Sequence, residues 1–344
     1  MQSDNFTWKV KLFLVLFGVG LSLIALEIFT RLYFKRAQGT EFADLKELRA
    51  AMLKDGGGNI RGDAQGSGEP SANLRGLVVP HPDDDIIYDL IPGLEIRFQR
   101  ADVRINSYGM RGPERPVYKG ADTFRIALLG DSFAFGWGVE QEETFAQILE
   151  NTLNRISRGN PNFEVLNFGI PGYSTFQEVA KFKEIGLDFN PDAVLVFFID
   201  NDFGFPFYVR DVYNPGSIMS AVSFARLTWS DAEPEIEEQK EQLTSYDPNR
   251  AIRKLHEICK EVGIPLYFTI NPRKDWRRHY RKLWILKERP DIRFINMRPE
   301  LLKAIEDFNI EEKDLTLSFD PHPSPLRHNL YGNLLAQHFM EYIQ

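Results

Sequence analysis

Apolar residues follow two rhythms from residue 124 onward. Continuous apolar runs occupy 124–129, 193–199 and 265–270, and Gly, Pro, Asn or Asp residues bound them. Such runs are typical of strands that are covered on both faces. Between the runs, apolar residues recur every three or four positions, as in 144–156, which predicts amphipathic helices. This alternation predicts an α/β domain over residues 124–344, a parallel sheet with helices on both faces.

The N-terminus carries a different pattern. From Leu12 to Leu26 every residue is apolar, Gly or Ser. Counted over 8–30, the run has about the 20 residues that a helix needs to cross a bilayer. No small-x-small cleavage pattern follows it, which favours an uncleaved anchor over a signal peptide or a core helix. We therefore predict a single transmembrane helix at about 8–30, within an anchor of residues 1–36.

Three further segments differ in composition from the α/β domain. Residues 37–75 are polar and rich in Gly, which predicts a flexible linker. Residues 76–123 hold short strand-like pieces and predict an N-terminal extension packed on the catalytic domain. Residues 203–245 begin aromatic and end acidic, and they follow a predicted strand. They form an insertion at the edge where ligands bind, either a lid over the site or a decoration.

Charge and metal-binding residue types exclude several classes of function. The chain has 41 basic and 49 acidic residues, a net charge of −8, which argues against a nucleic-acid partner. Cys259 is the only cysteine, so neither an intrachain disulfide nor a Cys-based zinc site is available. His328, His338 and the segment His81–Asp85 match no metal-ligand spacing. We therefore predict no metal and no cofactor.

Polar residues follow three predicted strands where each strand ends, and two more precede the last helix. They are Asp131 and Ser132 after the first strand, Gly169 after the second, Asn201 and Asp202 after the third, and Asp320 and His322 near the C-terminus. The carboxyl ends of parallel strands line the crevice of an open α/β sheet. We therefore expect these residues to lie close together.

These residue types suit acyl transfer. A serine hydroxyl becomes a nucleophile when a histidine accepts its proton and a carboxylate orients that histidine. Ser132, His322 and Asp320 provide this set. The N–H groups of Ser132 and Gly169 and the amide of Asn201 are candidate donors to the oxyanion. Each residue alone has a structural explanation as a turn or cap residue, but their order and placement together favour catalysis.

The four segments resemble, in the same order, the four conserved blocks of the SGNH (GDSL-type) hydrolase superfamily. The chain departs from the common pattern at Ile199, where the family often has glycine, and at Phe319, where it often has the acid. The stretch 104–112 is similar to a lead-in of membrane-anchored bacterial members. The resemblance implies a flavodoxin-like three-layer α/β/α sandwich, ester hydrolysis, and a catalytic domain outside the cytoplasm.

These observations predict a serine esterase that removes acetyl or other short acyl groups from a cell-envelope glycan or lipid. The same residues would serve an O-acyltransferase acting on an envelope polysaccharide. A third reading is an inactive anchored scaffold, against which the intact Ser132–His322 pair speaks. The resemblance implies a single-pass inner-membrane protein with a periplasmic domain, whereas the basic flanks of 8–30 slightly favour the opposite orientation. Trp137 either lines an acyl pocket or packs in the core.

Overall fold

The computed structural model describes residues 8–38, 76–83, 85–203 and 247–343. Five parallel strands form one sheet in the order β6-β5-β7-β8-β9. The strands are β5 (Thr123–Gly130), β6 (Asn162–Asn167), β7 (Ala193–Phe198), β8 (Leu266–Ile270) and β9 (Arg293–Ile295). Because β6 lies on one side of β5 and the later strands lie on the other, the chain reverses direction across the sheet between β5 and β7. A crevice forms at such a switch point, beyond the carboxyl ends of the strands.

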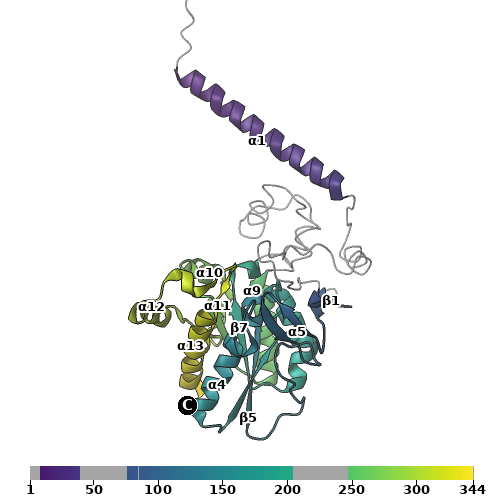
Figure 1. Cartoon of the computed structure of the whole chain (residues 1–344), viewed down its shortest axis with the longest axis vertical. Helices are drawn as coiled ribbons and strands as arrows, with labels where there is room; N and C mark the ends of the chain where they lie inside the picture. Colours follow the sequence, from purple (N-terminus) through teal and green to yellow (C-terminus); the bar gives the residue numbers. More distant parts are fainter. Residues whose placement is uncertain (1–7, 39–75, 84, 204–246, 344) are drawn as a thin grey trace, which may run out of the picture.

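Helices cover both faces of this sheet (Figure 1). One face carries α4 (Phe145–Ser157), α12 (Arg298–Asp307) and α13 (Pro325–Ile343), and the other carries α5 (Thr175–Ile185) and α9 (Pro248–Val262). Alternate residues of β5 enter the two cores: Ile126 and Leu128 pack with α4 and α13, whereas Ala127 and Leu129 pack with α5 and α9. The predicted parallel sheet with helices on both faces is confirmed.

Shorter elements complete the domain. They are α3 (Ser132–Phe135), η2 (Gln141–Glu143), η3 (Gly186–Phe189), η4 (Asp200–Phe203), α10 (Trp276–Lys282), α11 (Ile285–Glu288), η5 (Glu312–Leu315), and the antiparallel pair β10 (Thr316–Leu317) and β11 (Asp320–Pro323). Four of them, α3, η4, β10 and β11, lie next to the predicted site residues in the sequence. The predicted insertion, from residue 204 onward, lies outside the described residues.

The segment before β5 forms two antiparallel hairpins, β1 (Val78–Pro80) with β2 (Tyr88–Leu90) and β3 (Glu95–Phe98) with β4 (Ala101–Arg104). Their apolar side chains share a third core with Trp137, Ile170 and Tyr173, from the loops that follow β5 and β6. The Tyr88 hydroxyl donates to the carbonyl of Pro171 at 2.8 Å. The hairpins therefore pack on the loops at the carboxyl edge of the sheet.

The N-terminal run predicted to span a membrane lies on helix α1 (Trp8–Gln38). Among the residues that the structure describes, no helix is long and apolar enough to cross a membrane. The structure therefore does not support the predicted span at 8–30. From residue 39 on, the predicted linker lies outside the described ranges.

A buried ion pair fastens the β1–β2 hairpin to α5. The Lys181 ammonium lies 2.5 Å from Asp89 Oδ2, and the two side chains are 5% and 11% exposed. Burial raises the pKa of Asp89, and the charge and hydrogen bond of Lys181 oppose that rise. Lys181 also contacts Glu184 at 3.1 Å. The pair contributes to stability only while both members are present, because an isolated buried charge is strongly unfavourable.

We predict that Lys181→Met lowers the free energy of unfolding by about 3–5 kcal/mol, the usual cost of leaving one member of a buried pair alone. Without Lys181 the pKa of Asp89 rises further above its ordinary value, so the loss is largest at pH values above the raised pKa of Asp89 in the variant and fades as the pH falls through that pKa. Chemical denaturation between pH 4 and pH 8 measures both effects. The exposed Lys183 of the same helix is the control, and Lys183→Met should change stability by about 0.5 kcal/mol or less. Equal losses in the two variants would contradict the prediction.

Candidate active site

A tight strand-to-helix turn presents Ser132 at the carboxyl end of β5. The strand ends at Gly130, where a Cβ would lie 2.7 Å from the Cβ of Ala134. Asp131 then caps α3, since its Oδ1 accepts a hydrogen bond from the N–H of Phe133 at 2.9 Å. The helix ends after one turn at Gly136, which has a φ of 89°, a left-handed conformation that favours glycine. Ser132 thus stands at the start of a rigid turn.

The structure brings the three predicted catalytic side chains together. His322 Nε2 lies 2.8 Å from Ser132 Oγ, and His322 Nδ1 is hydrogen-bonded to Asp320 Oδ1. Asp320 Oδ1 also accepts from the backbone N–H of His322 at 2.9 Å. This local turn on β11 allows an acid only two residues before the histidine to reach its ring. A hydroxyl, an imidazole and a carboxylate therefore lie in the order that acyl transfer requires.

The electrostatics of the pair fit this order. Burial acts to raise the pKa of Asp320, but the hydrogen bonds and charge of His322 outweigh it, so the pKa of Asp320 lies below its ordinary value. An ionised Asp320 accepts the proton of His322 Nδ1 in a hydrogen bond. This leaves Nε2 as the acceptor for the Ser132 hydroxyl.

Aromatic rings hold the His322 side chain. The ring of Trp137 stacks on it with centroids 4.8 Å apart and an interplanar angle of 15°, and the ring of Phe133 lies 5.5 Å away. Phe98, at the end of β3, packs edge-on against Trp137 at 4.8 Å. The N-terminal extension therefore supports the histidine through a chain of two aromatic contacts.

The three predicted oxyanion donors are engaged to different degrees. The N–H of Gly169 donates to Asn167 Oδ1 at 2.9 Å, and the amide of Asn201 donates to Asp131 Oδ2 at 2.8 Å. Asn201 keeps its second amide N–H for another acceptor. Within the described part of the chain, the N–H of Ser132 donates to no other group. Ser132 and Asn201 thus supply donors at the site, whereas the Gly169 N–H already has a partner.

Gly169 has a steric role that the sequence did not reveal. A Cβ at this position would lie 2.3 Å from the backbone nitrogen of Phe135 and 2.9 Å from the Cβ of Ala134. The amide of Asn167 also donates to the carbonyl of Ala134 at 2.8 Å. The loop after β6 therefore packs directly against the backbone of α3, and only glycine fits at the closest point.

Sequence reasoning did not assign roles to two other residues at this turn. Asp131 Oδ2 accepts from the Asn201 amide and lies 3.1 Å from Ser132 Oγ, where it is a second acceptor for the hydroxyl proton besides His322 Nε2. Arg111, in the lead-in segment, is buried and donates to the carbonyls of Phe135 at 2.9 Å, of Val139 at 2.5 Å, and of Gly136. Burial lowers the pKa of Arg111 to about 9, so the guanidinium stays charged at neutral pH. The only sequence signal was the position of both residues inside motifs of the resemblance.

The histidines considered as metal ligands lie elsewhere. His328 is fully buried on α13, and its Nδ1 accepts from the N–H of Phe145 at 3.2 Å. Burial lowers the pKa of His328 to about 3, so the ring is neutral. His81 pairs with Glu184 at 3.1 Å. No group of three or more potential metal ligands occurs in the ranges that the structure describes.

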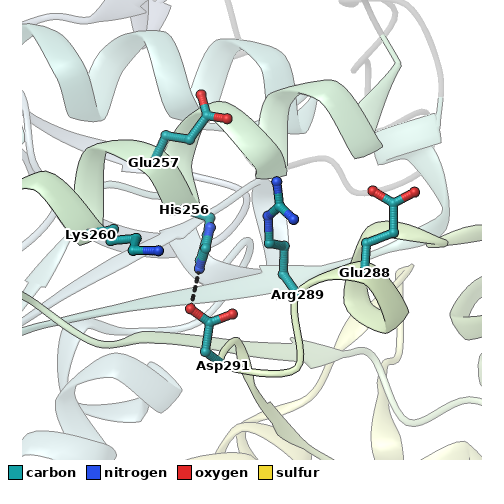
Figure 2. A pocket seen from close by; sticks show the side chains of 6 residues that line it. All are labelled: His256, Glu257, Lys260, Glu288, Arg289 and Asp291. Carbon is teal, nitrogen blue, oxygen red and sulfur yellow. Dashed lines mark hydrogen bonds and ion pairs between the residues drawn. The ribbon is translucent and has the colours of Figure 1, made fainter.

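Figure 2 shows a pocket of about 340 Å³ that is distinct from the triad. It lies between α9 and the segment that joins α11 to β9, and His256, Glu257, Lys260, Glu288, Arg289 and Asp291 line it. His256 Nε2 points toward Asp291 Oδ2, 2.7 Å away. None of the lining residues carries a hydroxyl or a thiol. This second His–Asp pair therefore lacks the nucleophile that His322 has.

The fold is similar to those of several solved structures. They include the psychrotrophic esterase EstA from a Pseudoalteromonas species, at 12% identity and a TM-score of 0.41, covering 64% of this chain and 98% of that one. The lipase/acylhydrolase from Enterococcus faecalis has 17% identity and a TM-score of 0.38, covering 64% and 96%. A member of the lipolytic protein G-D-S-L family from Veillonella parvula has 12% identity and a TM-score of 0.38, covering 63% of this chain and 98% of that one. No family model and no curated protein sequence matches the chain.

We predict that Gly169→Ala lowers kcat by about 10²-fold, because the added Cβ displaces α3 and a shift of 1 Å at a catalytic group has this effect. Hydrolysis of a chromogenic acyl ester measures it. Gly159→Ala is the control, since Gly159 has a φ of 76° but no atom within 4 Å of its added Cβ. That variant should lose about 1–2 kcal/mol of stability from backbone strain and keep its kcat. A fully active Gly169→Ala enzyme would show that the close approach is unimportant.

Proposed function

We propose that this chain is a serine carboxylic ester hydrolase. The observation that carries the proposal is the hydrogen-bonded series from Ser132 Oγ through the His322 ring to Asp320. Its position beyond the carboxyl ends of β5 and β7, at the switch point of the sheet, is where ligands bind in this architecture. An inactive scaffold would have no need of a nucleophile, a base and an acid in hydrogen-bonding order.

The geometry supports a two-step reaction. Ser132 Oγ attacks the ester carbonyl carbon while its proton moves to His322 Nε2, and the carbonyl oxygen becomes an oxyanion. The N–H of Ser132 and the second N–H of the Asn201 amide face that charge. Collapse of the intermediate releases the alcohol, which takes the proton from His322, and the acyl group stays on Ser132. Water, activated in turn by His322, then releases the carboxylic acid.

The proposal extends to the class of substrate. We infer acetyl or other short acyl esters of a cell-envelope glycan or lipid, on the basis of the four sequence blocks and their lead-in at 104–112. A sugar hydroxyl in place of water would make the same acyl-enzyme an O-acyltransferase. An assay with esters of increasing acyl length, with and without a sugar acceptor, separates these activities.

We predict that Ser132→Ala lowers kcat for ester hydrolysis by about 10⁴-fold or more, because the nucleophile is lost. Thermal unfolding should change little, since the hydroxyl lies at a turn and not in either apolar core. Initial rates on an acetyl ester measure the loss of activity, and thermal denaturation of both proteins measures the stability.

Two matched variants sharpen this test. His322→Ala should be nearly as inactive as Ser132→Ala, because the members of one catalytic unit are strongly non-additive. Asp320→Asn should lower kcat but leave measurable activity, since the carboxylate orients the base and does not take the proton. A Ser132→Ala enzyme as active as the wild type would refute the proposed function. A fully active Asp320→Asn enzyme would move the acid elsewhere, with Asp314 as the first alternative.

We further propose that the chain associates with the inner membrane and that its catalytic domain lies on the periplasmic side. Large apolar side chains of α1 are exposed, among them Phe13, Leu16 and Leu23, at 63%, 62% and 61%. Exposed apolar surface of this kind is typical of segments that contact a lipid or another protein. The side of the membrane rests on the resemblance of the sequence blocks.

We predict that the full chain sediments with membranes, whereas a chain beginning at residue 76 is recovered in the soluble fraction. Protease added to intact spheroplasts should cleave the full chain and release the catalytic domain. Recovery of the full chain in the soluble fraction would contradict the membrane association. Protection from protease until the cells are lysed would place the domain in the cytoplasm.

A further inference from the structure

Two buried carboxyl groups lie directly behind the catalytic turn, and the reaction described above does not use them. Glu178, on α5, is 2% exposed, and Asp202, on η4, is 1% exposed. Both oxygens of Glu178 receive no hydrogen bond from a donor group, whereas the Thr175 hydroxyl acts on Asp202 as a donor that lowers its pKa. Within the described ranges, no Lys, Arg or His side chain forms an ion pair with either residue. Buried acceptors without donors are costly and need an explanation.

A shared proton explains this arrangement. The two buried side chains share one site where α5 packs against η4, and a hydrogen bond between their carboxyl groups requires one of them to be protonated. Burial, the neighbouring carboxyl of Asp202 and the carboxyl of Asp131 all raise the pKa of Glu178 well above its ordinary value. Two like charges held in one buried site do not both ionise. The proton on Glu178 turns an unpaired acceptor into a donor.

The pair is connected to the oxyanion donor Asn201. Asp202 Oδ2 accepts from the N–H of Ile199 at 2.6 Å, which closes the turn that carries Asn201 out of β7. The Asn201 amide then reaches Asp131 Oδ2 beside Ser132. Glu178 packs behind this turn from α5 and touches no reacting group.

We propose that Glu178 is a positioning residue that keeps its proton, donates a hydrogen bond to Asp202, and thereby holds the Ile199–Phe203 turn and the Asn201 amide in place. The proposal rests on the ester hydrolase function given above. The proton on Glu178 also has an electrostatic role. If both carboxyl groups of the pair were ionised, a further negative charge would lie near the oxyanion. Asp131, whose carboxyl faces the pair from the nucleophile turn, already contributes negative charge when ionised, and His322 is the titratable group beyond it.

The proton on Glu178 links stability to pH in a definite direction. The folded chain keeps the proton, and the unfolded chain releases it above the ordinary value of 4.5. The wild type is therefore progressively destabilised as the pH rises from about 4.5 to the folded-state pKa of the pair, by up to about tenfold in the unfolding constant per pH unit. Glu178→Gln removes this dependence, because an amide has no proton to lose and can still donate to Asp202.

Two series of measurements on the full chain test the proposal. In the first, chemical denaturation from pH 5 to pH 9 compares the wild type with Glu178→Gln. The unfolding constant of the wild type divided by that of Glu178→Gln should increase with pH, because only the wild type is destabilised as the pH rises. The same substitution at the exposed Glu306 is the control, and it should leave the ratio constant. A ratio that does not change with pH for Glu178→Gln would show that Glu178 is ionised in the fold, and it would overturn the proposal.

The second series follows acetyl ester hydrolysis from pH 5 to pH 10. Glu178→Gln should keep a kcat close to that of the wild type and lose the alkaline fall that ionisation of the pair produces. Glu178→Leu, which fills the space without a donor, should lower kcat by about 10²-fold with little change in KM, the effect of losing one oxyanion donor. A Glu178→Leu enzyme with wild-type kcat would overturn the positioning role. If the wild type hydrolyses no ester, the proposed function fails, and the denaturation series alone decides whether the pair keeps its proton.

Discussion

The carboxyl group of Asp131 is the point on which the geometry of the site depends. One oxygen caps α3, and the other accepts hydrogen bonds from the Asn201 amide and the Ser132 hydroxyl. It therefore ties the end of β5 to the end of β7 across the switch point of the sheet. Burial raises the pKa of this group, and the hydrogen bonds from Phe133, Asn201 and Ser132 oppose that rise. Since Ser132 and Asn201 share this acceptor, a displacement of either one is transmitted to the other.

The segment before β5 is part of the same construction. Arg111 places a buried positive charge against the carbonyl groups that follow the nucleophile, and its guanidinium lies 4.7 Å from the centre of the Phe135 ring. Phe98 supports Trp137, which stacks on His322. The turn that carries Ser132 and the ring of His322 are thus both braced by residues that precede the first strand of the sheet. A catalytic domain that begins at residue 124 lacks both supports.

Much of this arrangement follows from the sequence, because it depends on local patterns. Continuous apolar runs fix the strands, and residues at the ends of neighbouring parallel strands meet in space, which placed Ser132 beside Asn201. The close approach of Gly169 to Phe135 could not be predicted from the sequence, because it depends on how the loop after β6 packs against α3. No pattern in the sequence pointed to the role proposed for Glu178. A glutamate in the first turn of a helix usually lies in solvent and interacts favourably with the helix dipole. Contacts between side chains of distant segments are set by packing, and they leave no periodic pattern of apolar residues in a single sequence.

In the proposed reaction, the charges around Ser132 must serve two opposite demands. As the proton moves to His322, the ring becomes positive, and the carboxyl groups of Asp320 and Asp131 both stabilise it. The oxyanion formed at the same moment is negative, and Asp131, which contacts Ser132 Oγ, opposes it. The donors on Ser132 and Asn201 offset that repulsion only while few other negative charges lie nearby. The protonated, uncharged carboxyl group proposed for Glu178 meets this condition and leaves Asp202 as the acceptor that holds the turn. The same burial that makes these carboxyls costly for the fold therefore keeps the field at the serine favourable for acyl transfer.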